Sequence, residues 1–269
     1  MKFNGRYMLL FIVLMAFTGV SFAASPVTGG IQPGKYPVYA VNHHTPEAFK
    51  KAADYWKSLQ KVELELGRAY RFRDLPKLGM REPYVGYITL GDSGQQFGVI
   101  VDIYGEEKRL YIDTDGDGSF KNEPMTLLLN EWQGLQVYWV IGPEPLEVKV
   151  KYKALNKVCP IYINVSGFLN PQSLFVKEKP FLLVQVRTWF LAKVQEDGHE
   201  KYFAIVDRNH NGRYDDPDDQ LFIDYDNNLY FSEKEAVARK KGVRFKTANG
   251  YMTADWGPYP EYLMLGGNK

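Results

Sequence analysis

The feature that most restricts how this chain can fold is a long succession of short runs rich in β-branched and aromatic residues, each ended by a turn. Some of these runs alternate polar and apolar residues, as the segment 147–152 does, which is the pattern of a half-exposed strand. Aromatic residues make up 15% of the chain, and they also favour β-sheet. The sequence therefore predicts a mainly β protein made of antiparallel, sandwich-like units. We expect strands at 62–66, 84–90, 96–104, 108–113, 125–129, 135–141, 146–152, 161–165, 181–194 and 201–206.

One segment near the N-terminus has a helical pattern instead. Between residues 45 and 60, Thr45 can cap a helix and Pro46 fits its first position. Apolar residues then recur at helical spacing and would form one face. The sequence predicts this single N-terminal amphipathic helix, and a shorter helix at 232–241. The apolar face consists of Phe49, Ala52, Ala53, Trp56 and Leu59.

The first residues have the three-part layout of a secretory signal. Lys2 and Arg6 form a positive start, residues 8–20 form an apolar run, and Ala23 ends a small-residue cleavage site. The apolar run is shorter than the roughly 20 residues that a membrane-spanning helix needs; an uncleaved N-terminal anchor is the alternative. No later stretch is long and apolar enough to span a membrane. We therefore expect an exported protein, periplasmic or extracellular.

Net charge and cysteine content argue against two classes of function. The formal net charge at pH 7 is +1, whereas a nucleic-acid-binding protein normally has a basic excess. Cys159 is the only cysteine of the chain, so the disulfides that exported proteins often use are excluded within the molecule. No histidine has a spacing that would make Cys159 a catalytic thiol. We expect Cys159 to be a small buried core residue.

Two short acidic loops have the clearest chemistry. The first is Asp113-Thr-Asp-Gly-Asp-Gly-Ser-Phe120 and the second is Asp207-Arg-Asn-His-Asn-Gly-Arg-Tyr214. In both, oxygen-bearing side chains occupy positions 1, 3 and 5, with a glycine at 6 and an aromatic residue at 8. Calcium prefers six to eight oxygen ligands, and the glycine allows a sharp turn that brings in the carbonyl oxygen of position 7. Tight turns use the same residue types, but carboxylates at alternate positions repel one another when no cation is near.

This spacing resembles the calcium loops of EF-hand proteins and the related loops of dockerins. The resemblance is limited to about a dozen residues in each place. It implies calcium as the bound ion, with side-chain ligands at positions 1, 3 and 5 and a carbonyl ligand at position 7. EF-hand loops are flanked by helices, whereas both loops here follow strand-like sequences, so we expect strand-entered variants. The implied ligands are Asp113, Asp115, Asp117 and Ser119 in the first loop, and Asp207, Asn209, Asn211 and Arg213 in the second.

The closing ligand of each loop is less regular. An EF-hand loop has a glutamate at position 12. The first loop has Pro124 there and Glu123 one residue earlier, so Glu123 is the expected ligand. The second loop has Asp218 at position 12, which is the expected ligand there. Other acids stand close to it, at Asp215, Asp216 and Asp219.

A third segment, Asp224-Tyr-Asp-Asn-Asn228, has the same alternation of oxygen-bearing residues. Leu229 stands where the other two loops have a glycine. The segment is either a degenerate metal site or a hairpin turn, and Asp224 could also complete the second loop. The sequence does not decide between these roles.

The surroundings of the two loops suggest an internal duplication. Each loop follows a turn, a basic residue and an aromatic strand, and each is followed by a proline. Two similar β units are the simplest interpretation. We therefore expect a signal peptide at 1–23, an extended lead-in at 24–44, a first unit at 45–155 with the calcium loop 113–124, and a second unit at 156–269 with the calcium loop 207–219.

Together these features predict an exported calcium-binding β protein in which calcium is mainly structural. The favoured function is a non-enzymatic binding or adhesion module whose partner is an extracellular glycan or protein. The alternative is a secreted calcium-dependent hydrolase acting on polysaccharide, which would need two carboxylates about 5 to 10 Å apart. No catalytic residue is assigned, because the strands offer only Asp102, Glu63 and Glu65. A groove lined by Trp132, Trp139, Trp189 and Trp256 would favour the enzyme, and burial of these aromatics would favour the module.

Overall fold

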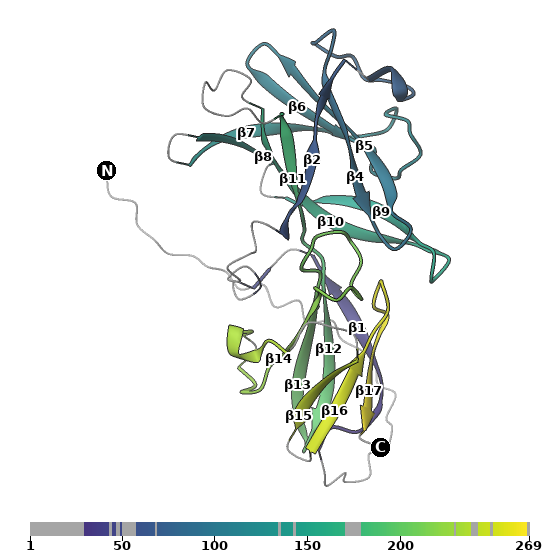
Figure 1. Ribbon diagram of the computed structural model, residues 1–269, viewed down its shortest axis with the longest axis vertical. Helices are drawn as coiled ribbons and strands as arrows, with labels where there is room; N and C mark the ends of the chain where they lie inside the picture. Colours follow the sequence, from purple (N-terminus) through teal and green to yellow (C-terminus); the bar gives the residue numbers. More distant parts are fainter. Residues whose placement is uncertain are drawn as a thin grey trace, which may run out of the picture.

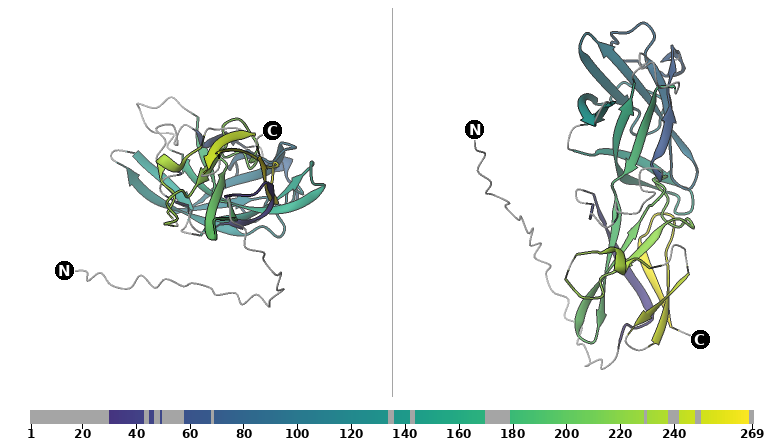
Figure 2. Two further views of the ribbon diagram at one scale, coloured as in Figure 1. Left: turned by 90° about the horizontal axis from the view of Figure 1, so that it is seen from below. Right: turned by 60° about the vertical axis from the view of Figure 1, so that its left-hand side comes forward.

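The protein forms two antiparallel β-sheets that follow each other along the long axis of the molecule (Figures 1 and 2). The prediction of a mainly β, antiparallel fold is confirmed. The computed structural model describes residues 30–42, 45–46, 49, 58–67, 69–133, 136–141, 144–169, 179–228, 230–237, 242–247 and 250–267.

The larger sheet has ten strands in the order β2-β11-β10-β8-β7-β6-β5-β4-β3, with β9 paired to β10. Strands such as β9 and β11 alternate buried and more exposed residues, as predicted for strands that cover a core on one face. The strands are β2 (Gln60–Glu63), β3 (Glu65–Leu66), β4 (Tyr84–Leu90), β5 (Gln95–Tyr104), β6 (Glu107–Ile112), β7 (Met125–Gln133), β8 (Gln136–Ile141), β9 (Leu146–Tyr152), β10 (Lys157–Phe168) and β11 (Phe181–Val186).

The ten-stranded sheet curls until its two end strands are consecutive in the chain. These end strands, β2 and β3, are separated only by Leu64. The Gln60 side chain links β2 to β4, because its Nε2 donates to the Thr89 carbonyl (2.7 Å) and its Oε1 accepts from the Thr89 N–H (2.9 Å). The sheet is therefore nearly closed.

The smaller sheet has seven strands in the order β14-β13-β12-β1-β17-β16-β15. Phe203 of β13 and Phe245 of β15 pack with ring centroids 5.8 Å apart, although their strands lie at opposite ends of this order. This sheet is therefore curled as well. Its strands are β1 (Gly34–Val41), β12 (Trp189–Glu196), β13 (His199–Val206), β14 (Gln220–Ile223), β15 (Val243–Thr247), β16 (Gly250–Asp255) and β17 (Tyr262–Gly267).

The chain crosses between the two sheets at Arg187 and Thr188. The single strand expected at 181–194 is therefore two strands in different sheets. The expected division at 155/156 falls in the turn between β9 and β10, inside the ten-stranded sheet. The expected lead-in, 24–44, contains β1, which lies in the middle of the seven-stranded sheet. The two sheets also differ in strand number and order.

Most of the segment expected as an N-terminal helix, 45–60, lies outside the described residues, as does the signal segment. Phe49 and Ser58 within it have helical conformation. Elsewhere in the described part of the chain the helices are two three-residue 3-10 turns, η1 (Ala69–Arg71) and η2 (Glu233–Glu235). η2 falls within the second expected helix. No helix among these residues is long and apolar enough to cross a membrane.

Buried apolar side chains form three clusters. The main core contains the inner residues of both sheets, and Cys159 is buried in it, as predicted. The Trp189 cluster lies on the other face of β12 to β14. It consists of Phe49, Trp189, Ala204, Val206, Phe222 and Phe231. The Phe72 cluster covers the outer face of β4 to β6, and it consists of Ala69, Phe72, Val85, Ile100, Tyr111 and Phe120.

Candidate metal centres

The first acidic loop follows β6 and folds around the carboxylate of Asp113. Asp113 Oδ1 accepts the N–H groups of Gly116 (2.8 Å) and Asp117 (3.1 Å), and its Oδ2 accepts that of Gly118 (2.8 Å). Asp113, Asp115 and Asp117 each place a carboxylate oxygen within 4.8 Å of the other two. This group could hold a metal ion.

The segment after η1 fixes the first loop from outside. The Arg73 N–H donates to the Gly118 carbonyl (2.9 Å), and its guanidinium donates to the Asp117 carbonyl (2.6 Å). The Ser119 hydroxyl donates to the Asp74 carboxylate (2.9 Å). The loop is therefore held in its curled form by contacts that are distant in sequence.

The second acidic loop follows β13 and folds around Asp207. The Gly212 N–H donates to Asp207 Oδ2 (2.7 Å). The side-chain amides of Asn209 and Asn211 both donate to Asp216 Oδ2, at 3.3 and 2.6 Å. The loop thus brings the predicted residues Asp207, Asn209 and Asn211 together, and it adds Asp216.

A third acidic loop follows β14. The carboxylates of Asp224, Asp226 and Glu235 each offer an oxygen within 4.8 Å of the others, so this group could also hold a metal ion. The Asn228 N–H donates to Asp224 Oδ1 (3.1 Å) and to Asp226 Oδ1 (3.2 Å). Glu235 lies in η2, where the Ser232 N–H and hydroxyl donate to its Oε2 at 2.8 and 2.9 Å. Counted from Asp224, Glu235 stands at position 12, where an EF-hand loop has its closing glutamate.

The three loops share one pattern of local hydrogen bonds. In each, the position-3 side chain accepts the N–H of position 5, and the position-5 side chain accepts the N–H of position 7. Position 4 has a positive φ in all three loops, 71° at Gly116, 56° at His210 and 56° at Asn227. The three loops therefore share these hydrogen bonds and the positive φ at position 4.

A further shared hydrogen bond identifies the acid that closes each loop. The N–H of position 2 donates to Glu123 Oε2 (2.9 Å) in the first loop, to Asp219 Oδ1 (3.1 Å) in the second and to Glu235 Oε1 (2.8 Å) in the third. Asp218, expected in the second loop, is exposed, whereas Asp219 is buried. Asp219 was named as a nearby acid but not chosen, because it stands at position 13. Counting twelve residues from Asp224 would have found Glu235.

The aromatic residue at position 8 attaches each loop to a different part of the core. Phe120 lies in the Phe72 cluster, Tyr214 in the main core and Phe231 in the Trp189 cluster. This position turns away from the acidic side chains, as predicted. A change in loop conformation would therefore disturb the packing of the sheet beside it.

Like Asp113, Asp219 and Asp224, Asp207 is buried. Its side chain is 2% exposed, and burial raises its pKa, although the N–H groups of Gly212, His210 and Asn211 oppose the shift. Burial and the negative charge of Asp207 raise the pKa of Asp219 as well. Within the described residues, Asp207 Oδ1 is buried and has no hydrogen-bond partner. Such an oxygen costs about 1 to 3 kcal/mol, and a cation would offset that cost.

The pKa values in the first loop are shifted in the same direction. Burial raises the pKa values of Asp113 and Glu123 more than their hydrogen bonds lower them. The negative charge of Asp115 raises both pKa values further. A cation among these carboxylates would act in the opposite direction, because it favours their ionised forms.

The second loop contacts the ten-stranded sheet directly. The Gly91 N–H, at the end of β4, donates to the Asn211 carbonyl (2.8 Å), and the Tyr152 hydroxyl of β9 donates to the Gly212 carbonyl. A Cβ on Gly212 would lie 2.9 Å from Ile161 Cδ1 of β10. This loop of the seven-stranded sheet therefore packs tightly against its neighbour.

The same loop also holds the segment where the chain crosses between the sheets. The Val186 N–H donates to His210 Nδ1 (3.2 Å), and the Tyr214 hydroxyl donates to the Thr188 carbonyl (3.0 Å). Burial lowers the pKa of His210 to about 3, so the imidazole is neutral and Nδ1 can accept. The second loop is thus the main polar connection between the two sheets among the described residues.

Comparisons of this chain with protein-family models, with curated proteins and with solved structures give no match. The function is therefore inferred from the geometry of the three acidic loops. Ser119 and Arg213, whose carbonyls are expected ligands, stand at position 7 of their loops, and their N–H groups make the shared hydrogen bond described above.

Proposed function

We propose that this protein is exported and binds calcium in its three acidic loops, and that calcium fixes the two sheets to each other. The observation that carries the proposal is the buried, unpartnered Oδ1 of Asp207. The same loop contains a second buried acid, Asp219, and both burial and the negative charge of Asp207 raise the pKa of Asp219. Two such carboxylates repel each other in a metal-free fold, and a divalent cation between them removes the repulsion.

The donor set favours calcium over other metals. Zinc sites in proteins use cysteine and histidine, whereas the loops offer carboxylate, amide and carbonyl oxygens. Magnesium demands near-ideal octahedral geometry, and calcium accepts the flexible mixture of side-chain and backbone oxygens that such loops supply. The proposed ligands are Asp113, Asp115, Asp117, Ser119 and Glu123 in loop one; Asp207, Asn209, Asn211, Arg213 and Asp219 in loop two; and Asp224, Asp226, Asn228, Tyr230 and Glu235 in loop three.

The role that fits these sites is structural. Calcium switches of the EF-hand kind act by changing the angle between two helices, but here each loop follows a strand. The second and third loops lie at the two ends of β14, an edge strand of the seven-stranded sheet. Ions in these loops would fix that edge and its contact with the ten-stranded sheet.

A binding or adhesion module accounts for the described residues better than a hydrolase does. Asp102 is buried and accepts the N–H groups of Gly79 and Met80 (2.8 Å each), so it holds a loop. Trp189 and Trp256 are buried, and Trp189 lines a cavity of about 10 Å³ beside Asp207, while the side chains of Trp132 and Trp139 are outside the described set. We therefore favour a non-enzymatic module with an extracellular glycan or protein partner.

Export and calcium binding support each other. The secretory signal would take the protein to a calcium-rich compartment, where dissociation constants of about 10⁻⁴ to 10⁻³ M are sufficient. The chain has one cysteine and so cannot form an internal disulfide. Bound ions would supply the stabilisation that disulfides give other exported proteins.

The choice between Asp218 and Asp219 as the closing acid gives a direct test of the second site. We expect Asp219→Asn to weaken calcium binding at this loop by about tenfold or more, because a charged ligand is lost. Asp218→Asn, at the exposed neighbouring position, is the matched control and should bind as the wild type does. Calorimetric titration measures both, and a larger effect for Asp218→Asn would contradict the assignment.

The stability of the metal-free protein should depend on pH in a characteristic direction. The pKa values of Asp207 and Asp219 are raised in the folded protein, so the folded state binds protons more tightly than the unfolded state. Stability is then greatest near the unfolded pKa of about 4 and falls as the pH rises through neutrality. Saturating calcium should remove this fall, because it favours the ionised carboxylates.

Denaturant unfolding at mildly acidic and neutral pH, with and without calcium, measures this dependence. Asp219→Asn is the control, since it removes one of the two carboxylates and should flatten the metal-free curve. Metal-free wild-type protein that becomes more stable as the pH rises would contradict the role of this pair.

A further inference from the structure

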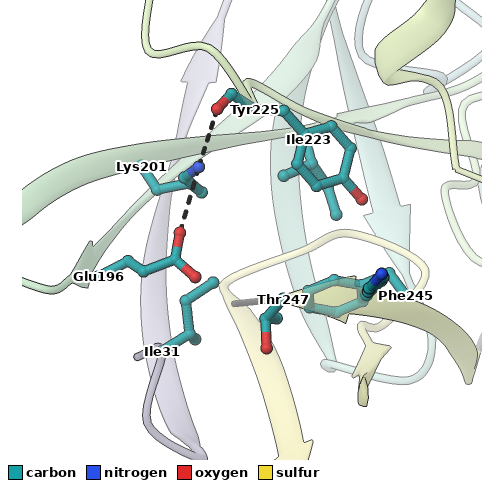
Figure 3. Close-up of a pocket in the computed structure, with 8 residues that line it drawn as sticks. Ile31, Glu196, Lys201, Ile223, Tyr225, Phe245 and Thr247 are labelled. Carbon is teal, nitrogen blue, oxygen red and sulfur yellow. Dashed lines mark hydrogen bonds and ion pairs between the residues drawn. The ribbon is translucent and has the colours of Figure 1, made fainter. Parts of the chain in front are cut away.

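The curled seven-stranded sheet leaves a cavity of about 440 Å³ between its two ends (Figure 3). On one side the wall is formed by the end of β12, by β13 and β14, and by the first residues of the third acidic loop. On the other side it is formed by β15, and the chain just before β1 completes it. The lining residues are Ile31, Glu196, Lys201, Ile223, Tyr225, Phe245, Lys246 and Thr247.

The wall of the cavity is mostly apolar and contains one ion pair. Lys201 and Glu196 form an ion pair (3.2 Å), and their side chains are 9% and 13% exposed. Lys201 Nζ also donates to the Tyr225 carbonyl (3.2 Å). Lys201 Nζ also lies 5.7 Å from the centroid of the Tyr225 ring. An ammonium group has three donors, so the contacts with Glu196 and the Tyr225 carbonyl leave a third N–H for a ligand. Figure 3 shows Lys201 and Glu196 on one side of the cavity and Phe245 with Thr247 across from them.

The combination of an apolar wall with an ion pair is typical of a ligand-binding site and not of a packing defect. Small-molecule sites are typically cavities of about 300 to 1,000 Å³ with apolar walls and a few polar groups that orient the ligand. A buried lysine–glutamate pair adds little stability, because desolvation offsets the attraction between the charges. If the Lys201–Glu196 pair orients a ligand, its position in the wall of the cavity is explained.

The charges of the wall indicate which ligand the cavity suits. Two lysines line it against one glutamate, Glu196: Lys201 is buried, and Lys246 is exposed. We infer that the cavity binds a small amphiphile with an aliphatic or aromatic body and a single carboxylate. The carboxylate would accept from Lys201 Nζ, and the body would pack on Ile223 and Phe245. This site goes beyond the calcium loops and uses none of their acidic side chains.

Octanoate is a suitable probe, with octylamine as the ligand of equal length and opposite charge. Calorimetry of the folded protein in calcium should show saturable binding of octanoate and at least tenfold weaker binding of octylamine. Displacement of the fluorescent anionic amphiphile anilinonaphthalene sulfonate by octanoate gives a second readout. Absence of octanoate binding, or tighter binding of octylamine, would overturn the inference.

Two variants locate the binding. Lys201→Met should weaken octanoate about tenfold or more, because a charge-assisted hydrogen bond is lost. Lys193→Met is its matched control, since Lys193 forms an exposed ion pair with Glu200 on the same two strands, and it should bind as the wild type does. Thr247→Trp keeps the buried ion pair and fills the cavity, so it should abolish binding even if Lys201→Met fails to fold. Wild-type affinity in Thr247→Trp would place the ligand elsewhere and overturn the inference.

Discussion

Removal of calcium is expected to lower the melting temperature by roughly 5 to 10 °C for each site that is emptied. A ligand that binds only the folded state at 100 times its dissociation constant stabilises that state by about 2.7 kcal/mol. In a protein of this size, each kcal/mol shifts the melting temperature by about 2 to 4 °C. Thermal unfolding in excess calcium and after chelation measures the difference.

The loss should be reversible and specific to calcium. Re-addition of calcium should restore the melting temperature, whereas magnesium at the same concentration should restore less of it, because its octahedral geometry suits these loops poorly. An unchanged melting temperature in excess chelator would show that the acidic loops act as ordinary turns.

Substitution of Gly212 should be much more damaging than the same substitution at Gly118. Both glycines stand at position 6 of an acidic loop, with φ values of 72° and 78°. Alanine at either position costs about 1 to 2 kcal/mol for the left-handed backbone. At Gly212 the added Cβ would also lie 2.9 Å from Ile161 Cδ1 and 3.3 Å from Leu90 Cβ, whereas at Gly118 nothing lies within 4 Å.

We therefore expect Gly212→Ala to cost about 1 to 3 kcal/mol more than Gly118→Ala, because the extra carbon forces the second loop away from the ten-stranded sheet. Denaturant unfolding of both variants in metal-free buffer gives the two free energies without a contribution from bound ions. Equal losses at the two positions would mean that the contact between the second loop and the ten-stranded sheet contributes little to stability.

Most strands from β2 to β13 were predictable, because the residues of each strand reflect which of its faces is buried. The alternation in segments such as 147–152 reflects one buried face, and the bounds of most of these strands differ from the expected ones by a few residues. β1 and β14 to β17 were not expected as strands. The partition into sheets was not predictable in this way. β1 pairs with β12 and β17, which lie far from it in sequence, and no local pattern records such a partner. The crossing at Arg187 and Thr188 likewise lies inside the segment 181–194, which has no turn residue to mark a break between two strands.

In the acidic loops, too, the features set by neighbouring residues were predictable, and those set by residues distant in sequence were not. Positions 1, 3 and 5 of the first two loops were recognisable from spacing alone. The third loop was left undecided because Leu229 replaces the glycine, although Asn227 supplies the positive φ at position 4. Asp219 could not be preferred over Asp218 from sequence, because its burial depends on the packing around β14. The position of the second loop between the sheets required the fold itself.

The most direct test of the central claim is the number of calcium ions bound by the wild type and by Asp113→Ala, Asp207→Ala and Asp224→Ala, measured by calorimetric titration. We expect one ion for each acidic loop in the wild type and one ion fewer in each variant. We also expect the largest loss of stability in Asp207→Ala, since that loop joins the two sheets. The account would be contradicted if Asp207→Ala bound as many ions as the wild type. The buried Oδ1 of Asp207 would then face a single water in the adjacent cavity of about 10 Å³.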